Sequence, residues 1–158
     1  IINWSIIFII TLLPYNIKSI NIYILYSSGL MFPLSILISR LIKADWKNND
    51  NPIGSLGLYL NIAQIMYFPL LFWIFAKNPG YMIMFFAIIT GAHFFPYSWY
   101  YKTKAYLIMS PIISIIIAII GWNIEIDDLW QIAVAMVILL IILVSWLYID
   151  YKKVIQSN

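Results

Sequence analysis

Long apolar runs, separated by short polar or proline-containing stretches, fill nearly the whole chain. A membrane-spanning helix needs about 20 mostly apolar residues, and six such runs follow one another, the first of them short. Because the connecting stretches are brief, neighbouring helices are expected to run antiparallel. We therefore predict an all-α fold, a polytopic membrane protein whose residues 1–158 form a single transmembrane helical domain. The predicted spans cover residues 1–13, 20–42, 55–76, 81–101, 105–122 and 129–151.

The first apolar run, residues 1–13, lacks the basic flank and the small-residue cleavage site of a secretory signal. The chain starts on Ile1 without a methionine. We interpret this run as a transmembrane span of which part precedes Ile1.

Proline interrupts the second, third, fourth and fifth predicted spans. Each proline removes one backbone hydrogen bond and clashes with the preceding turn, and in lipid the freed carbonyl must find another partner. Two interpretations stay open: ordinary kinking, which is common in membrane helices, or kinks that separate the helices and open a cavity on one side. The interior prolines are Pro33, Pro69, Pro96 and Pro111.

Charge is scarce and unevenly placed. Only 9% of the residues are charged and 64% are hydrophobic, whereas a soluble domain carries roughly 25% charged residues. Lipid is therefore expected to be the main solvent. Cytoplasmic loops of membrane proteins carry an excess of Lys and Arg, which predicts a cell-membrane protein with both termini cytoplasmic. The residues that gather on the predicted cytoplasmic side are Arg40, Lys43, Lys47, Lys102, Lys104, Lys152 and Lys153, against Lys18 and Lys77 on the other.

Several kinds of chemistry have no support in the sequence. The net charge is only +3 and the lysines lie at span ends, so we expect no nucleic acid to bind. Cysteine is absent and histidine occurs once, which leaves a metal or bis-histidine haem site short of ligands. We expect neither a metal nor another cofactor. No zinc-protease motif, phosphate-binding glycine loop or nucleophile elbow is present. No carboxylate lies in the interior of a span, since Asp150 is near a span end, which disfavours proton-driven transport.

Polar side chains within the spans mark a candidate ligand-binding site. His93 is the only histidine, and an ionisable group inside a span is a functional-site hypothesis by default. At about 1.5 Å of rise per residue, His93 and Gln64 lie roughly 13 Å, and Asn61 roughly 9 Å, from the predicted cytoplasmic face. Asn61 and Gln64 are three residues apart, and His93 and Tyr97 four, so each pair shares a helix face. We predict that these four residues bind a ligand, with His93 neutral unless an anionic group sits beside it.

Five serines of the second, fifth and sixth predicted spans lie at a depth similar to that of His93 and Gln64. Taken singly, they are interpreted as interhelical hydrogen-bond donors, which contribute about 0.6 kcal/mol each on average. They are Ser35, Ser39, Ser110, Ser114 and Ser145.

The run Gly-Ala-His-Phe-Phe-Pro-Tyr at residues 91–97, with Phe68 and Pro69 upstream, resembles a small family of bacterial multi-pass membrane proteins of unknown function. The resemblance covers most of the chain. It implies no activity, catalytic residue or ligand.

Three functions stay open. The leading one is the binding or transport of a small molecule or lipid through a polar inner-leaflet pocket around His93, with the Phe-Pro kinks shaping its apolar wall. The second is a membrane-embedded enzyme in which His93 is the general base and Tyr97, Asn61 or Gln64 is its partner. The third is a non-catalytic accessory membrane subunit. Membrane lipid and a small amphipathic molecule are the expected partners, and assembly as a homo-oligomer or within a larger membrane complex is left open.

Overall fold

The computed structural model describes residues 1–29, 33, 37–38, 40–41, 59–60 and 62–156, and every regular element that it assigns in them is a helix. This confirms the all-α prediction for the part of the chain described. The polar loop at residues 43–52, together with Ser35, Ser39 and Asn61, lies outside it. The elements are α1 (Ile2–Thr11), α2 (Ile17–Gly29), η1 (Gln64–Tyr67), α5 (Phe68–Lys77), η2 (Pro79–Tyr81), α6 (Met82–His93), α7 (Tyr97–Tyr100), α8 (Lys104–Asn123), η3 (Ile126–Asp128) and α9 (Trp130–Gln156).

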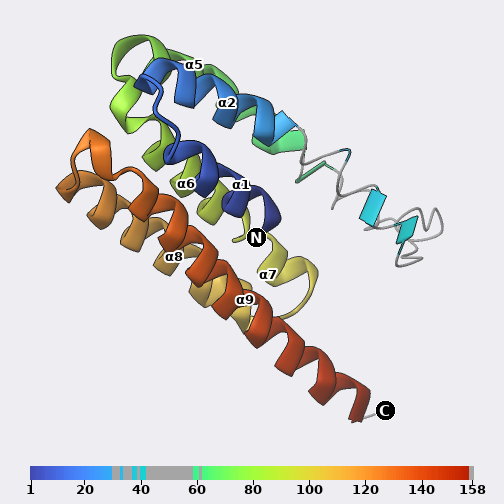
Figure 1. Cartoon of the computed structure of the whole chain (residues 1–158). Coiled ribbons are helices and arrows are strands. Elements are labelled where there is room, and N and C mark those ends of the chain that lie inside the picture. The colour runs from blue at the N-terminus through green and yellow to red at the C-terminus, as the bar shows by residue number, and fades with distance from the viewer. Residues whose placement is uncertain (30–32, 34–36, 39, 42–58, 61, 157–158) are drawn as a thin grey trace.

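The longer described helices, which are α1, α2, α5, α6, α8 and α9, run in alternating directions along the chain (Figure 1). Helix α6 packs mainly on α8, and α9 packs on both α8 and α1. The turns between α1 and α2, between α5 and α6, and between α8 and α9 all lie at one end of the molecule, while α7 and the C-terminus lie toward the other (Figure 1). This antiparallel order agrees with the short connections in the sequence.

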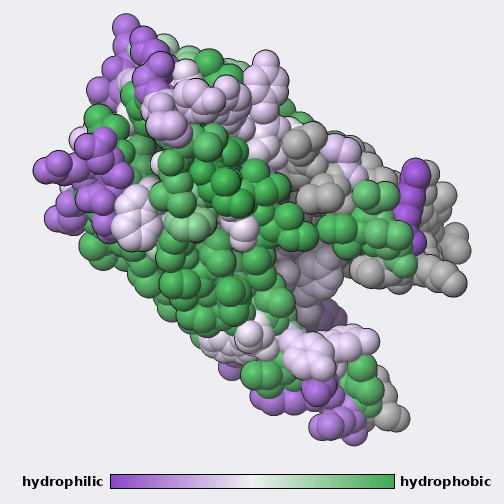
Figure 2. Space-filling view, viewed as in Figure 1, coloured by the Kyte–Doolittle hydropathy of each residue, from purple (hydrophilic) through white to green (hydrophobic). Residues whose placement is uncertain are grey.

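In the part of the chain that the structure describes, three stretches are long and apolar enough to cross a membrane: Pro79–Tyr100, Lys104–Asn123 and Ile126–Lys153. They coincide with the predicted fourth, fifth and sixth spans. Two shorter apolar helices of the described residues, Ile2–Thr11 and Gln64–Lys77, overlap the predicted first and third spans. Figure 2 shows a hydrophobic surface between hydrophilic groups at the two ends of the molecule. Length, composition and surface together indicate a membrane-associated protein.

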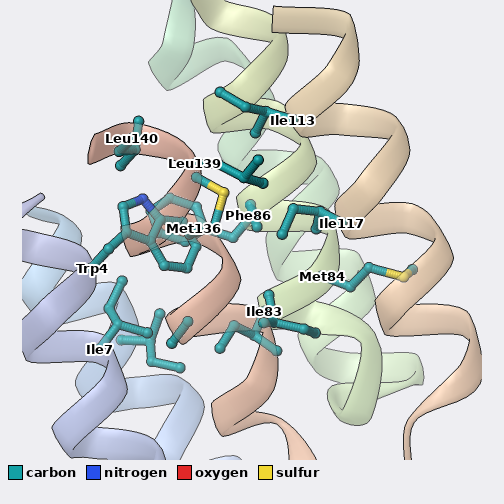
Figure 3. Close-up of a cluster of buried hydrophobic side chains, with 14 of the residues drawn as sticks. Trp4, Ile7, Ile83, Met84, Phe86, Ile113, Ile117, Met136, Leu139 and Leu140 are labelled. Carbon is teal, nitrogen blue, oxygen red and sulfur yellow. The ribbon is translucent and has the colours of Figure 1, made fainter. Parts of the chain in front are cut away.

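The core lies where α1, α6, α8 and α9 meet (Figure 3). Trp4 of α1 stacks on Phe86 of α6, with ring centroids 5.4 Å apart and planes at 29°. Large aliphatic side chains fill the space around this pair. Those that are fully buried include Ile7, Ile83, Ile113, Ile117, Ile132 and Met136.

Glycine allows α6 and α8 to approach closely. A Cβ atom added at Gly91 would lie 2.7 Å from Cγ2 of Ile113, and one added at Gly121 would lie 2.5 Å from Cγ of Met84. Small residues at such crossings are typical of helix packing in membranes. The pair of contacts fixes how closely the two helices can lie.

Serine hydroxyls reinforce the same interface. Ser110 Oγ donates to the Gly91 carbonyl at 2.7 Å, and Ser114 Oγ lies 3.4 Å from the Ile88 carbonyl while also bonding within α8. The interpretation of these two serines as interhelical donors is thus confirmed. Ser145 is exposed on α9, so it does not join a common polar level.

The prolines differ from one another in their effect on the helices. Helix α8 continues through Pro111. Pro69 lies in the first turn of α5, where a missing N–H group breaks no bond of α5 itself, and it is interior to the apolar helix Gln64–Lys77 that η1 and α5 form together. Pro96 falls between α6 and α7, so the fourth apolar stretch is divided rather than bent. The neighbours of Pro33 lie outside the described residues.

Candidate functional site

The backbone tightens where α6 ends at His93. The Phe94 N–H donates to the Gly91 carbonyl at 3.2 Å, and the Tyr97 N–H donates to the Phe94 carbonyl at 3.1 Å. These bonds span three residues, the spacing of a 3₁₀ turn. Pro96 has no N–H group, and that of Tyr97 is directed to Phe94, so neither of the usual helical donors reaches the His93 carbonyl. The tighter turn brings Tyr97 beside His93.

Helix α7 is a single turn that ends in a left-handed residue. Lys102 has φ of 51°, and the Thr103 N–H reaches back to the Ser98 carbonyl at 3.2 Å. This is the six-to-one bond of a Schellman motif, in which glycine is the usual left-handed residue. The sharp reversal places α8 directly after α7 and turns Tyr106 toward Tyr97.

Thr103 ties this reversal to the last helix. Its hydroxyl oxygen accepts a hydrogen bond from the Ala105 N–H at 3.1 Å, which caps the start of α8. The same hydroxyl donates to Oδ2 of Asp150 at 2.7 Å. One side chain therefore holds the beginning of α8 against the C-terminal part of α9.

Three tyrosines from α7, the reversal and α8 form a compact cluster. Tyr97, Tyr101 and Tyr106 have ring centroids 5.9 Å apart in every pairing. His93 meets the edge of Tyr97 at 5.3 Å, and Phe94 stacks on Tyr106 at 6.1 Å. Burial, with a smaller contribution from neighbouring Tyr100, raises the pKa of Tyr101 above its ordinary value of 10.0, so this phenol is protonated at neutral pH.

A cavity of about 290 Å³, here called the His93 cavity, opens against this cluster. It offers an amide, an imidazole and phenol hydroxyls as hydrogen-bonding groups, set among aromatic faces. Among the described residues, no charged side chain lines it, and no group of three His, Asp or Glu side chains could hold a metal. The cavity suits an uncharged polar group attached to an apolar body. Its lining residues are Gln64, Thr90, His93, Phe94, Tyr97, Tyr101 and Tyr106.

Three of the four predicted site residues, Gln64, His93 and Tyr97, line this one cavity. They come from η1, α6 and α7 respectively. The fourth, Asn61, lies outside the described residues. That these side chains bind a ligand stays a prediction.

Sequence reasoning left Thr90 and Tyr106 out of the site. Thr90 precedes His93 by three residues and so shares its helix face; its hydroxyl donates to the Phe86 carbonyl at 2.8 Å. Tyr106 follows Lys104 by two residues, at the same end of the bundle as Tyr97. The depth argument would have found neither, because Thr90 lies about 4.5 Å deeper than His93 along the same helix and Tyr106 lies at the very start of the predicted fifth span.

The described residues thus define a class: an α-helical protein with helices able to cross a membrane and an uncharged, aromatic-walled cavity near one end of them. The chain matches the model of one family, described as a family of unknown function (DUF7010), over residues 1–150. The match covers nearly the whole chain, and the protein belongs to this family. It confirms the resemblance to an uncharacterised family. No curated protein and no solved structure gave a match.

Proposed function

We propose that the protein binds a small, uncharged amphipathic molecule, a lipid or a lipid-like compound, in the His93 cavity. Gln64, His93 and Tyr97 hydrogen-bond to the polar end of this molecule. Phe94 and Tyr106 contact its apolar part. The observation that carries the proposal is that three polar side chains from three separate elements line one cavity of about 290 Å³.

The chemistry of the lining supports binding of a neutral group. Binding pockets are mostly apolar with a few placed polar groups and measure about 300 to 1,000 Å³. The His93 cavity is close to the lower end of that range. Gln64 offers an amide and His93 an imidazole to this cavity, and each of these groups can donate and accept hydrogen bonds. An open cavity beside His93 favours binding over a role in helix packing alone.

We propose further that the protein is a six-span protein of the cell membrane with both termini in the cytoplasm. The alternating helix directions support this topology (Figure 1), because they bring the basic residues around α7 and the C-terminus to one end. The excess of Lys on the cytoplasmic side is the usual determinant of orientation. In this orientation the His93 cavity lies in the half of the bundle nearer the cytoplasm. The basic residues at this end include Lys102, Lys104, Lys152 and Lys153, and the acidic turn at the other end holds Glu125, Asp127 and Asp128.

Native mass spectrometry of the protein extracted from membranes tests the binding proposal. The unmodified protein is expected to retain a small-molecule adduct. His93→Phe keeps the ring volume but removes both nitrogens, and is expected to lose the adduct. His93→Gln keeps one donor and one acceptor and is expected to retain part of it.

Tyr81→Phe provides a matched control, because Tyr81 is exposed and does not line the cavity. It is expected to retain the adduct in full. Equal adduct occupancy in the unmodified protein and in His93→Phe would exclude the His93 cavity as the binding site.

A further inference from the structure

Three exposed lysines lie where α8 begins and α9 ends. The hydrogen bond from the Thr103 hydroxyl to Oδ2 of Asp150, at 2.7 Å, joins these two parts of the chain. Two of the lysines are the chain neighbours of Thr103, and the third follows Asp150 by three residues and so shares its helix face. Lysine carries its charge on a flexible four-carbon stem, so the three ammonium groups can converge beside this bond. We call this surface the lysine patch, and it consists of Lys102, Lys104 and Lys153.

The lysine patch lies at the ends of two stretches long enough to cross a membrane. One of them begins at Lys104 and the other ends at Lys153. Exposed aromatic side chains in the same segments are typical of the boundary between hydrocarbon and lipid headgroups. The patch is therefore at the depth of the lipid phosphates. The aromatic residues are Trp99, Tyr101, Tyr148 and Tyr151.

The backbone at Lys102 is a second observation that points to this surface. Its φ of 51° lies in the left-handed region, where a residue with a side chain is strained and glycine is not. Strain that the surrounding structure maintains is found at functional sites, ligand clamps among them. The reversal itself needs no side chain at this position. The strain therefore indicates a function for the ammonium group of Lys102.

The charge of the lysine patch selects among lipid headgroups. The carboxylate of Asp150 accepts from Thr103, and its single negative charge leaves the three lysines with a positive surplus. A phosphate that carries a net negative charge offsets this surplus, and its oxygens accept hydrogen bonds from ammonium groups. A zwitterionic headgroup brings no net charge. Exposed apolar side chains next to the patch, such as Leu107 of α8 and Ile149 of α9, offer a surface for acyl chains.

We propose that the lysine patch binds the phosphate of an anionic phospholipid from the surrounding bilayer. The ammonium groups of Lys102, Lys104 and Lys153 contact the phosphate oxygens, and the acyl chains lie along the apolar surface of α8 and α9. The bound lipid holds the start of α8 and the end of α9 at the membrane boundary. This site is separate from the His93 cavity, whose proposed ligand is uncharged, and neither proposal depends on the other.

Competition between two lipids of equal chain length tests the proposal. The full chain is placed in nanodiscs that contain equal amounts of dioleoyl phosphatidylglycerol, which is anionic, and dioleoyl phosphatidylcholine, which is zwitterionic. Native mass spectrometry of the protein released from the nanodiscs measures the lipids that stay bound. One lysine near an anionic surface contributes about fivefold in affinity. The unmodified protein is therefore expected to retain phosphatidylglycerol in an excess of about fivefold or more.

Variants of the patch separate binding from folding. Lys102→Gln and Lys153→Gln are each expected to lower the excess of phosphatidylglycerol about fivefold, whereas Lys102→Arg keeps the charge and should keep the excess. Lys102→Gly is expected to lose the excess although it relieves the backbone strain and makes the protein more stable. A residue that served only the fold would not lose binding while the protein gained stability.

Lys152→Gln is the matched control, because it removes the same charge from the residue next to Lys153. The Lys152 ammonium lies 4.7 Å from the centre of the Tyr148 ring, on a different face of α9 from Asp150. Salt screens charges beyond a Debye length of about 10 Å, so this variant is expected to change the excess by less than about twofold. Equal losses in Lys152→Gln and Lys153→Gln would show a diffuse attraction and overturn the site.

Three further outcomes decide the proposal. Equal retention of the two lipids by the unmodified protein would overturn it. Sodium phosphate that displaces phosphatidylglycerol better than sodium chloride of equal ionic strength would show a site for the free anion, which would overturn the assignment to a lipid. His93→Phe is expected to keep the excess of phosphatidylglycerol while losing the neutral adduct, so the lysine patch and the His93 cavity fail separately.

Discussion

Lys102 holds a backbone conformation that side chains disfavour. It is the only non-glycine residue with positive φ in the described part of the chain, at 51°. The left-handed region costs an L-residue roughly 1–2 kcal/mol. The six-to-one bond from Thr103 to Ser98 and the tyrosine cluster around this reversal keep Lys102 there. The left-handed position of this Schellman motif is usually glycine or asparagine. Because it is a lysine here, the reversal could not be predicted from residue type.

Lys102→Gly is expected to stabilise the protein by about 1 kcal/mol, because glycine adopts positive φ without strain. At about 2–4 °C per kcal/mol for a chain of this size, the midpoint of thermal unfolding in detergent should rise by about that amount. Lys102→Ala serves as the control, since it removes the charge and keeps the strain. A similar gain from Lys102→Ala would show that charge, and not backbone conformation, is responsible.

Thr103→Val is expected to destabilise the protein by about 1–3 kcal/mol. Valine has nearly the same shape but neither caps α8 at Ala105 nor donates to Asp150. Thr103→Ser keeps the hydroxyl and should stay close to the unmodified protein in a thermal unfolding experiment. Equal stability of the valine and serine variants would mean that the hydroxyl contributes nothing.

At the scale of elements, close packing and proline decide how α6, α7 and α8 are arranged. Apolar runs with polar ends were enough to predict both ends of α8 and the start of α9 to within one residue, while α9 continues five residues beyond the predicted end at residue 151. They could not predict what each proline does, since Pro96 and Pro111 lie in similar apolar surroundings. The outcome depends on the surrounding backbone: α8 continues through Pro111, whereas at Pro96 the chain changes to three-residue bonds.

Gly91→Ala is expected to destabilise the protein by about 1–3 kcal/mol through overpacking. The new methyl group would lie 2.7 Å from Cγ2 of Ile113, a β-branched side chain with little rotamer freedom. Gly29→Ala is the matched control, since a Cβ atom there meets no described atom within 4 Å. Thermal unfolding should distinguish the two, and an unchanged midpoint for Gly91→Ala would show that α6 and α8 can separate without cost.

Pro96→Ala is expected to join α6 and α7 into one helix. The alanine N–H can donate to the carbonyl of Ala92, and that of Tyr97 can then return to His93. Hydrogen–deuterium exchange should slow at residues 94–98, and Tyr97 should move away from the His93 ring, weakening ligand retention. Unchanged exchange together with unchanged retention would show that the division at Pro96 does not shape the cavity.

For the whole molecule, the arrangement of polar residues between helices was only partly predictable. Gln64, His93 and Tyr97 stood out because polar groups are rare in apolar spans, and all three line the His93 cavity. Asn3 and Trp4 were overlooked, because a polar residue near the start of a run resembles a span end. Only tertiary packing shows that α1 buries both of them against α6 and α9. The sequence predicts how deep a residue lies along its span, but it does not predict which residue of another helix lies beside it.

Topology supplies the test at this scale. Because the chain has no cysteine, single cysteines can be introduced without removing native ones. Asn48→Cys and Ser157→Cys are expected to react with a membrane-impermeant maleimide only after the cells are opened, and Ile126→Cys in intact cells. Labelling of Asn48→Cys in intact cells would reverse the orientation and place the His93 cavity in the outer leaflet.

Trp4 gives the protein an optical reporter of its own. It is 1% exposed, against 79% for Trp122, so its emission arises in a dry environment against Phe86 of α6. Replacing the other six tryptophans by phenylalanine would leave this one chromophore. The emission of an indole shifts to longer wavelength when its N–H group donates to a polar acceptor. A separation of α1 from α6 that let water reach this N–H group would then be visible as a shift of the emission, in real time and without a label.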